Sequence, residues 1–283
     1  MTTLVRAALP AVPVVNRLPG VRKTGGAVDG LAHERSGVEV GRSQVERYAA
    51  VCGFPRKDTV PLTYPHVLAF PLHMAVMADP AFPWPAVGMV HVENVITGRR
   101  PVRVGESLDL WVGVEEPRPH ARGALVDFTT RARSGDEVVW ESTSTYLRRG
   151  VRVEGEAGTA LHLPEAPAGA LEWRLPADLG RRYAAVSGDH NPIHLYPLTA
   201  RALGFPRQIA HGMWSLARCV AALENRLPDA ATVEVAFRKP ILLPGTVGFG
   251  HEVTQVPEGD VHHFALSSPR DRRQHLVGVA RPA

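Results

Sequence analysis

The segment "RYAAVSGDHNPIH", residues 182–194, repeats part of an earlier segment, "RYAAVCG", residues 47–53. The two copies lie almost half of the 283-residue chain apart. Only the second copy continues into an acid and a histidine, Asp189 and His194. The repeat therefore predicts a duplicated structural unit in which only the second copy carries a chemical motif.

Each copy is preceded by residues that are typical of a helix start. Ser43, with Glu46 three residues later, has the pattern of a capping box, and Asp178 stands at the corresponding place before the second copy. Gly53 and Gly188 predict where the two helices end, because glycine commonly closes a helix. The sequence therefore predicts the same short helix in both halves.

A second, longer helix is predicted in each half. It is clearest over residues 211–227, and the weaker counterpart is residues 66–79. Apolar residues recur at helical spacing in the clearer segment and predict one buried face: Leu216, Val220, Leu223 and Leu227.

After its long helix each half turns to strands, over residues 88–149 in the first half and 232–282 in the second. Turn sequences at residues 133–137 and 267–273 predict hairpins. We therefore expect an α+β protein of two repeats. In each, an antiparallel sheet packs on a long helix, and the two sheets can join edge to edge.

A segment rich in Gly, Ala, Pro and Glu separates the two halves and lacks clear periodicity. We interpret it as a linker, which divides the chain into three parts: residues 1–150, the linker 151–170 and residues 171–283.

The composition indicates a packed protein of the reducing cytoplasm. The two cysteines, Cys52 and Cys219, lie in separate predicted helices and form no disulfide framework. Pro10 and Pro13 break the apolar run of residues 1–15, so we expect no export signal, and no segment is long enough to cross a membrane. A net charge of +4 without a basic aromatic block argues against nucleic acid.

The segment after the second short helix has the residues needed for acid–base chemistry. Asp189, Asn191 and His194 lie in a loop that Pro192 stiffens. A stiff loop can hold a carboxylate and an imidazole at a fixed separation, which proton transfer requires. His211-Gly212 then opens the long helix, where a backbone N–H at the positive end of the helix dipole suits a developing oxyanion.

These residues carry a resemblance to a known family. "GDHNPIH", followed by "HGM" at the start of an apolar helix, resembles the MaoC-like (R)-specific enoyl-thioester hydratases and dehydratases. The whole chain is similar to the two-domain members of that family, which have a double hot dog fold, and most of all to actinobacterial 3-hydroxyacyl-thioester dehydratases. The resemblance implies a degenerate N-terminal hot dog unit and a catalytic C-terminal unit.

The resemblance also implies a reaction. The enzyme would reversibly hydrate trans-2-enoyl thioesters, carried on coenzyme A or acyl carrier protein, to (R)-3-hydroxyacyl thioesters, with no cofactor. Asp189 and His194 would share one water, and the Gly212 N–H would hold the thioester carbonyl. Asn191 would position the substrate or the loop, and His211 would belong to the same substrate-binding region.

One departure from the family concerns the residues after the motif. Many members have Asp-Pro there, and this chain has Tyr196-Pro197. That aspartate is not part of the catalytic pair, so we expect a changed pocket shape and not a loss of activity.

The first half lacks the motif, because Phe54 stands where Asp189 stands in the second. We expect this half to act as a wall of the substrate tunnel. Its residues Phe70, Met74 and Met77 either line a tunnel for a long acyl chain or simply fill the core, and the sequence leaves both open.

Two further interpretations concern charged and metal-binding residues. Arg238 and Lys239 either contact the phosphates of the carrier or form a solvated strand end. Asp189, His190 and His194 are of the types that bind divalent metals. We nevertheless predict no metal, because the chain has no second ligand cluster at a convincing spacing.

Two other functions agree less well with the sequence. A hot dog thioesterase often uses an acid on the long helix, and this helix offers only Glu224, near its far end. A non-catalytic acyl-thioester-binding partner subunit would not need the intact "DHNPIH" motif. Pairing of two chains into a homodimer is left open.

Overall fold

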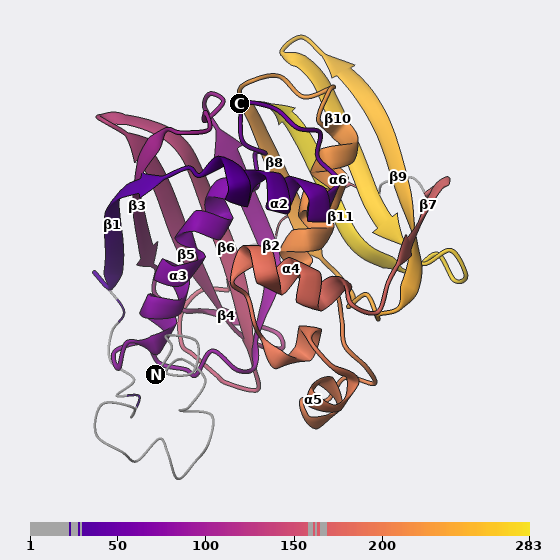
Figure 1. The fold of residues 1–283 in the computed structure, drawn as a ribbon. Coiled ribbons are helices and arrows are strands. Elements are labelled where there is room, and N and C mark those ends of the chain that lie inside the picture. The colour runs from indigo at the N-terminus through magenta and orange to yellow at the C-terminus, as the bar shows by residue number, and fades with distance from the viewer. Residues whose placement is uncertain (1–22, 24–27, 29, 158–160, 162, 165–168) are drawn as a thin grey trace.

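The computed structural model describes residues 23, 28, 30–157, 161, 163–164 and 169–283 (Figure 1). The predictions for residues 1–15 and for part of the 151–170 linker concern residues outside these ranges. None of the helices in the described part of the chain has the length and apolar character needed to span a bilayer.

The N-terminal unit consists of the elements before the linker. Its helices are α2 (Arg42–Cys52) and α3 (Tyr64–Ala78). Its strands are β1 (Ala32–Glu39), β2 (Met89–Gly98), β3 (Ser107–Val114), β4 (Arg118–His120), β5 (Gly123–Ser134) and β6 (Glu137–Arg149).

The C-terminal unit repeats this plan with additions. Its helical elements are α4 (Leu179–Ser187), the short 3₁₀ helix η3 (Pro192–His194), α5 (Pro197–Ala202) and α6 (Gly212–Leu223). Its strands are β7 (Leu171–Leu175), β8 (Ala231–Phe237), β9 (Gly245–Val256), β10 (Gly259–Ser267) and β11 (Gln274–Pro282).

The two units share one antiparallel sheet, in the order β1-β3-β5-β6-β2-β8-β11-β10-β9-β7, with β4 on β5. The units meet where β2 pairs with β8, from Glu93 opposite Ala236 to Gly98 opposite Ala231. Figure 1 shows the long helices α3 and α6 on the same side of this curved sheet. This arrangement confirms the predicted α+β double hot dog fold, with the sheets joined edge to edge.

The cores of the units follow the predicted helix faces. Leu216, Val220 and Leu223 of α6 are fully buried, whereas Leu227 lies beyond the end of the helix and is only partly buried. Cys52 and Cys219 are free, buried cysteines within α2 and α6, as expected.

The predicted starts of the short helices are correct for one helix only. Asp178 stands at the N-cap position of α4, as predicted, although its side chain makes no capping hydrogen bond. The capping box at Ser43 and Glu46 is wrong, because α2 begins at Arg42 with Gly41 as its N-cap. The Ser43 hydroxyl instead accepts a hydrogen bond from Arg47 one turn later (2.6 Å). Both helices end as predicted, at left-handed Gly53 and Gly188.

Two strands at the ends of the sheet were not predicted. β1 and β7 pair on one side only, with β3 and β9 respectively. β1 has no apolar alternation, the pattern by which a strand is recognised. β7 does alternate, with apolar Leu171, Trp173 and Leu175, but over only five residues next to the predicted linker.

Candidate active site

The carboxylate of Asp189 is held by the turn that ends α4. Gly188 closes the helix with a φ of 77°, which glycine adopts without strain. The Asp189 N–H then donates to the Ser187 hydroxyl (3.2 Å), and the Asp189 carboxylate accepts from the Asn191 N–H (3.1 Å). About a quarter of this side chain (26%) is exposed, and Asp189 lines the cavity described below.

The imidazole of His194 is held by the next turn. The Asn191 side chain caps the 3₁₀ helix η3 by accepting from the Ile193 N–H (3.3 Å). His194 is buried, and its Nδ1 lies 2.9 Å from the Ile209 carbonyl oxygen. A carbonyl only accepts, so Nδ1 carries the proton and Nε2 keeps a lone pair. His194 is therefore oriented as a base at Nε2.

Close packing of α4 against η3 sets the position of His194. A Cβ added at Gly180 would lie 1.9 Å from the His194 carbonyl oxygen, so only glycine allows this approach. The Arg181 guanidinium adds a hydrogen bond to the Leu195 carbonyl (3.0 Å). The helix before the motif therefore supports the motif directly.

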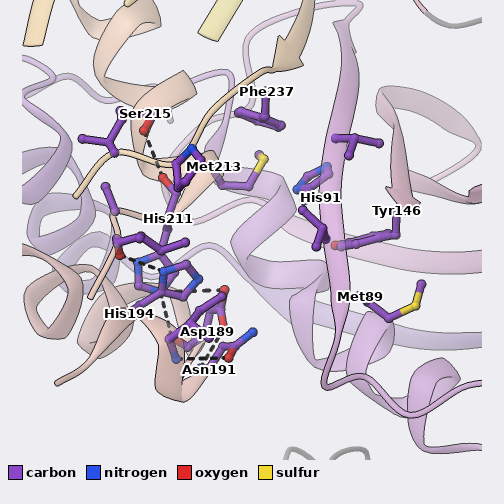
Figure 2. A pocket seen from close by; sticks show the side chains of 18 of the residues that line it. Met89, His91, Tyr146, Asp189, Asn191, His194, His211, Met213, Ser215 and Phe237 are labelled. Carbon is purple, nitrogen blue, oxygen red and sulfur yellow. Dashed lines mark hydrogen bonds and ion pairs between the residues drawn. The ribbon is translucent and has the colours of Figure 1, made fainter. Parts of the chain in front are cut away.

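His211 joins the pair at the start of α6. Its Nε2 donates to the Asp189 carbonyl oxygen (3.0 Å) and lies 3.7 Å from the Asp189 carboxylate. Its ring stacks on His194 with 3.7 Å between centroids (Figure 2). Gly212 is the first residue of α6, and the first N–H groups of a helix have no partner within it. The structure thus brings Asp189, His194, His211 and Gly212 to one place.

Burial controls the charges of this cluster. It lowers the pKa of His211 to about 3 and also lowers that of His194, although the Asp189 carboxylate opposes both shifts. Burial raises the pKa of Asp189, but His211 and His194 outweigh it and hold that pKa below its usual value. Near neutral pH the site therefore contains an ionised carboxylate beside neutral imidazoles.

The cluster also has the geometry to bind a metal. One ligand atom from each of Asp189, His194 and His211 lies within 4.8 Å of the other two. His211, and not the exposed His190 of the predicted ligand set, completes this group. The hydrogen bond of His194 Nδ1 to the Ile209 carbonyl leaves its Nε2 for proton transfer, whereas His211 Nδ1 is buried and has no partner among the described residues. That no metal is used stays a prediction.

A cavity of about 810 Å³ lies in front of this cluster and is lined by both units. The predicted site residues Asn191, Arg238 and Lys239 line it, and the last two are exposed. Both interpretations of α3 fit the structure, because Phe70, Met74 and Met77 line the cavity while Met74 and Met77 also belong to the buried core.

Other residues that line the cavity were missed by the sequence analysis. Arg122 and Arg149 are exposed basic residues of the N-terminal unit, on the same cavity as Arg238. Two residues of neighbouring strands, His91 and Tyr146, form a wall that Figure 2 shows across from Asp189, and His66 of α3 lines the same cavity. They belong to no motif, and only the sheet register brings the strand residues together.

The fold and this cluster place the protein in a structural class, the hot dog proteins in which two units line one cavity. Residues 164–266 match the model of the MaoC like domain. The chain is 39% identical to 3-hydroxyacyl-thioester dehydratase X of Mycobacterium tuberculosis, over 92% of this chain and 89% of that protein. The chain belongs to the MaoC-like family.

A crystal structure of that relative and one further relative support this assignment. The crystal structure of HtdX of Mycobacterium tuberculosis has a TM-score of 0.78 and 36% identity, and covers 89% of this chain and 100% of that one. The (R)-specific enoyl-CoA hydratase of Aeromonas caviae is 32% identical over 80 residues, which are 27% of this chain and 60% of that protein.

Proposed function

We propose that this protein is a hydro-lyase that reversibly hydrates trans-2-enoyl thioesters to (R)-3-hydroxyacyl thioesters. Its family and the names of its relatives, which are dehydratases and hydratases of acyl thioesters, support the reaction. The observation that carries the assignment is the Asp189 carboxylate beside His194, whose Nδ1 is bound to the Ile209 carbonyl. That bond leaves His194 Nε2 as a basic nitrogen near the Asp189 carboxylate, in a cavity of about 810 Å³.

The proposed chemistry uses one water held between Asp189 and His194 Nε2. The water oxygen bonds to C3 of the enoyl chain while one of the pair accepts a proton from that water. A proton is delivered to C2, and dehydration follows the same path in reverse. The acid and base roles are not divided between the residues, because two groups this close titrate as one system.

The backbone N–H of Gly212 is proposed to stabilise the thioester oxygen. Negative charge grows on that oxygen as water adds to C3, and a helix N-terminus presents unpaired N–H groups at a positive dipole end. Gly212 lines the cavity at the start of α6, beside His211. Asn191 contributes by capping the loop that holds the catalytic pair, which favours positioning the loop over binding the substrate.

The carrier of the acyl chain is proposed to bind at the basic edge of the cavity. Arg238 and Lys239 lie just beyond the end of β8, and Arg122 and Arg149 line the cavity from the other unit. Four exposed cations suit the phosphates of coenzyme A or of an acyl carrier protein arm.

The two units are proposed to have different roles, and the limits of each role are those of the predicted domains. Residues 1–150 would form a unit that binds the acyl chain without catalysing its reaction, and residues 171–283 the catalytic unit, with residues 151–170 between them. A cytoplasmic location and a homodimer are proposed with it. Light scattering on the purified chain tests the dimer.

A single assay tests the reaction. The full chain is given a short trans-2-enoyl-CoA, and both the loss of the conjugated double bond and the release of thiol are followed. The proposal expects loss of the double bond without thiol. Release of thiol would indicate a thioesterase instead, which Glu224 does not support, since it ends α6 in an ion pair with Lys57 (3.0 Å).

A further inference from the structure

The wall opposite the catalytic pair is polar, although it belongs to the unit without the motif. His66 comes from the first turn of α3, His91 from β2 and Tyr146 from β6, and all three line the catalytic cavity. Figure 2 shows the Tyr146 hydroxyl turned towards Asp189 across that cavity. A cavity built only for a hydrocarbon chain would not need these groups.

The three side chains form one packed cluster, the N-terminal polar cluster. His91 and Tyr146 are direct partners across the β2–β6 ladder, and their rings stack with 4.6 Å between centroids. His66 lies with its ring 6.3 Å from that of His91. Because helix and strands fix all three side chains, the cluster is preorganised.

Two ring nitrogens of this cluster lack hydrogen bonds. His66 Nδ1 and His91 Nε2 are buried and have no partner among the described residues, and His66 as a whole is only 4% exposed. An unsatisfied buried polar atom costs about 1–3 kcal/mol. His73, two turns further along α3, also has one bonded nitrogen, Nε2 to the Thr130 hydroxyl (2.8 Å), and one buried nitrogen without a partner, Nδ1. His66 and His91 differ from His73 in their position, because both line the cavity.

The cluster is neutral near neutral pH. Burial lowers the pKa of His66 to about 4 and that of His91 to about 3, and it raises the pKa of Tyr146. A neutral imidazole has one donor and one acceptor nitrogen, and a protonated tyrosine is a donor. Such a cluster matches a neutral group that both donates and accepts hydrogen bonds.

The cluster lies at the reacting end of the acyl-chain wall. His66, Phe70, Met74 and Met77 follow helical spacing on the cavity face of α3. At 1.5 Å per residue, Met74 and Met77 lie roughly 12 and 16 Å further along the helix than His66. The charge of Asp189 acts on His66 and opposes the lowering of its pKa by burial. The wall is therefore polar near the catalytic pair and apolar further away.

Resting on the function proposed above, we propose that His66, His91 and Tyr146 bind a hydroxyl group on the acyl chain a few carbons beyond C3. The substrates that suit this enzyme best are then enoyl thioesters that carry a second, distal oxygen. A hydroxyl can donate to an imidazole of this wall and accept from the Tyr146 hydroxyl. A plain chain makes neither hydrogen bond, and a carboxylate would be repelled by Asp189.

The test compares substrates of equal chain length on the full-length protein. One trans-2-enoyl-CoA is plain, and the others carry a hydroxyl on the fifth, sixth or seventh carbon. Hydrogen bonds that only the hydroxylated chain makes predict about tenfold higher kcat/KM for the best-placed hydroxyl. Equal or lower kcat/KM for every hydroxylated chain would overturn the inference.

Variants then assign the preference to residues. Tyr146→Phe removes only the hydroxyl, and it and His91→Phe should abolish most of the tenfold preference while kcat/KM on the plain chain stays within about threefold. His251→Phe, in β9 and outside the cavity lining, is the matched control and should keep the preference. Equal losses on plain and hydroxylated chains would show a structural role and reject the inference.

The same data separate this inference from the proposed function. If the wild-type protein hydrates the plain chain but shows no preference for a hydroxyl, only the inference fails. If it hydrates none of the enoyl thioesters, the proposed function fails and the inference fails with it.

Discussion

The helices α2 and α4 end in the same turn, but the residue that follows the turn differs. Each ends at a left-handed glycine, Gly53 or Gly188, and each continues into one residue that sets the character of its unit. In α2 that residue is Phe54, which is buried and packs on Tyr48 with 6.3 Å between ring centroids. In α4 it is Asp189, on the wall of the cavity. The same turn therefore leads into a buried core residue after α2 and into a cavity-lining residue after α4.

A second difference lies inside the helices. Val45 of α2 is a buried core residue, and Gly180 stands at the corresponding place in α4, where the His194 backbone lies against it. The catalytic loop thus needs two changes together, a carboxylate after the helix and a missing side chain within it. A hot dog unit can therefore keep its fold without the residues of the proposed site, because neither difference affects the sheet.

The largest expected effect comes from giving the second unit the residue of the first. Asp189→Phe should lower kcat/KM for enoyl hydration at least about a hundredfold, since it removes one partner of the acid–base pair. Phe54→Leu in the first unit is the control and should leave kcat/KM unchanged. Wild-type rates in Asp189→Phe would remove the carboxylate from the mechanism.

A smaller but still large effect is expected inside α4. Gly180→Val, the residue that α2 has, should push the His194 backbone away and lower kcat about 10- to 100-fold, because small displacements of catalytic groups are costly. Ala185→Val, on the exposed face of the same helix, is the matched control. Steady-state kinetics on both variants measures the difference, and equal rates would mean that this packing does not position His194.

The role of the first unit as a wall predicts a change of chain-length preference. Met74 lines the cavity, whereas its neighbour Ala75 is not among the lining residues. Met74→Trp should lower kcat/KM for a dodecenoyl thioester about tenfold relative to a crotonyl thioester, because it shortens the space for the chain. Ala75→Trp should leave that ratio unchanged. An unchanged ratio in Met74→Trp would place the chain elsewhere.

The pH dependence is the mildest of these tests. Whichever of Asp189 and His194 accepts the proton must be unprotonated, and the pKa of each lies below its usual value. As pH falls, kcat/KM should therefore stay constant past the ordinary imidazole pKa of about 6.5 and decline only below it. A decline centred at or above that value in a pH–rate profile would mean that the pair is less buried than the structure shows.

Much of the comparison could be predicted from the sequence, because it rests on local signals. The repeat predicted the two helices and their glycine ends, and the spacing of "DHNPIH" and "HGM" predicted which residues the structure brings together. The same signals misplaced the start of α2, where Gly41 and not Ser43 is the cap. Capping patterns a residue or two apart are difficult to distinguish from sequence.

The opposite wall of the cavity could not be predicted. His66, His91 and Tyr146 are far apart in the chain and follow no motif, and a lone histidine in an apolar segment is most often an ordinary core residue. His91 and Tyr146 meet only because β2 and β6 pair in one particular register. Register depends on the packing of the whole sheet, which the sequence of one strand does not specify.

The central claim is that Asp189 and His194 act as one unit on one water. The double variant Asp189→Asn with His194→Ala tests it most directly, compared with each single variant in the enoyl-CoA hydration assay. Each single change should lower kcat about a hundredfold or more, and the double variant should be no slower than the worse single variant, because removing either partner disables the unit. If the two losses multiply in the double variant, Asp189 and His194 act independently and do not work as one unit on one water.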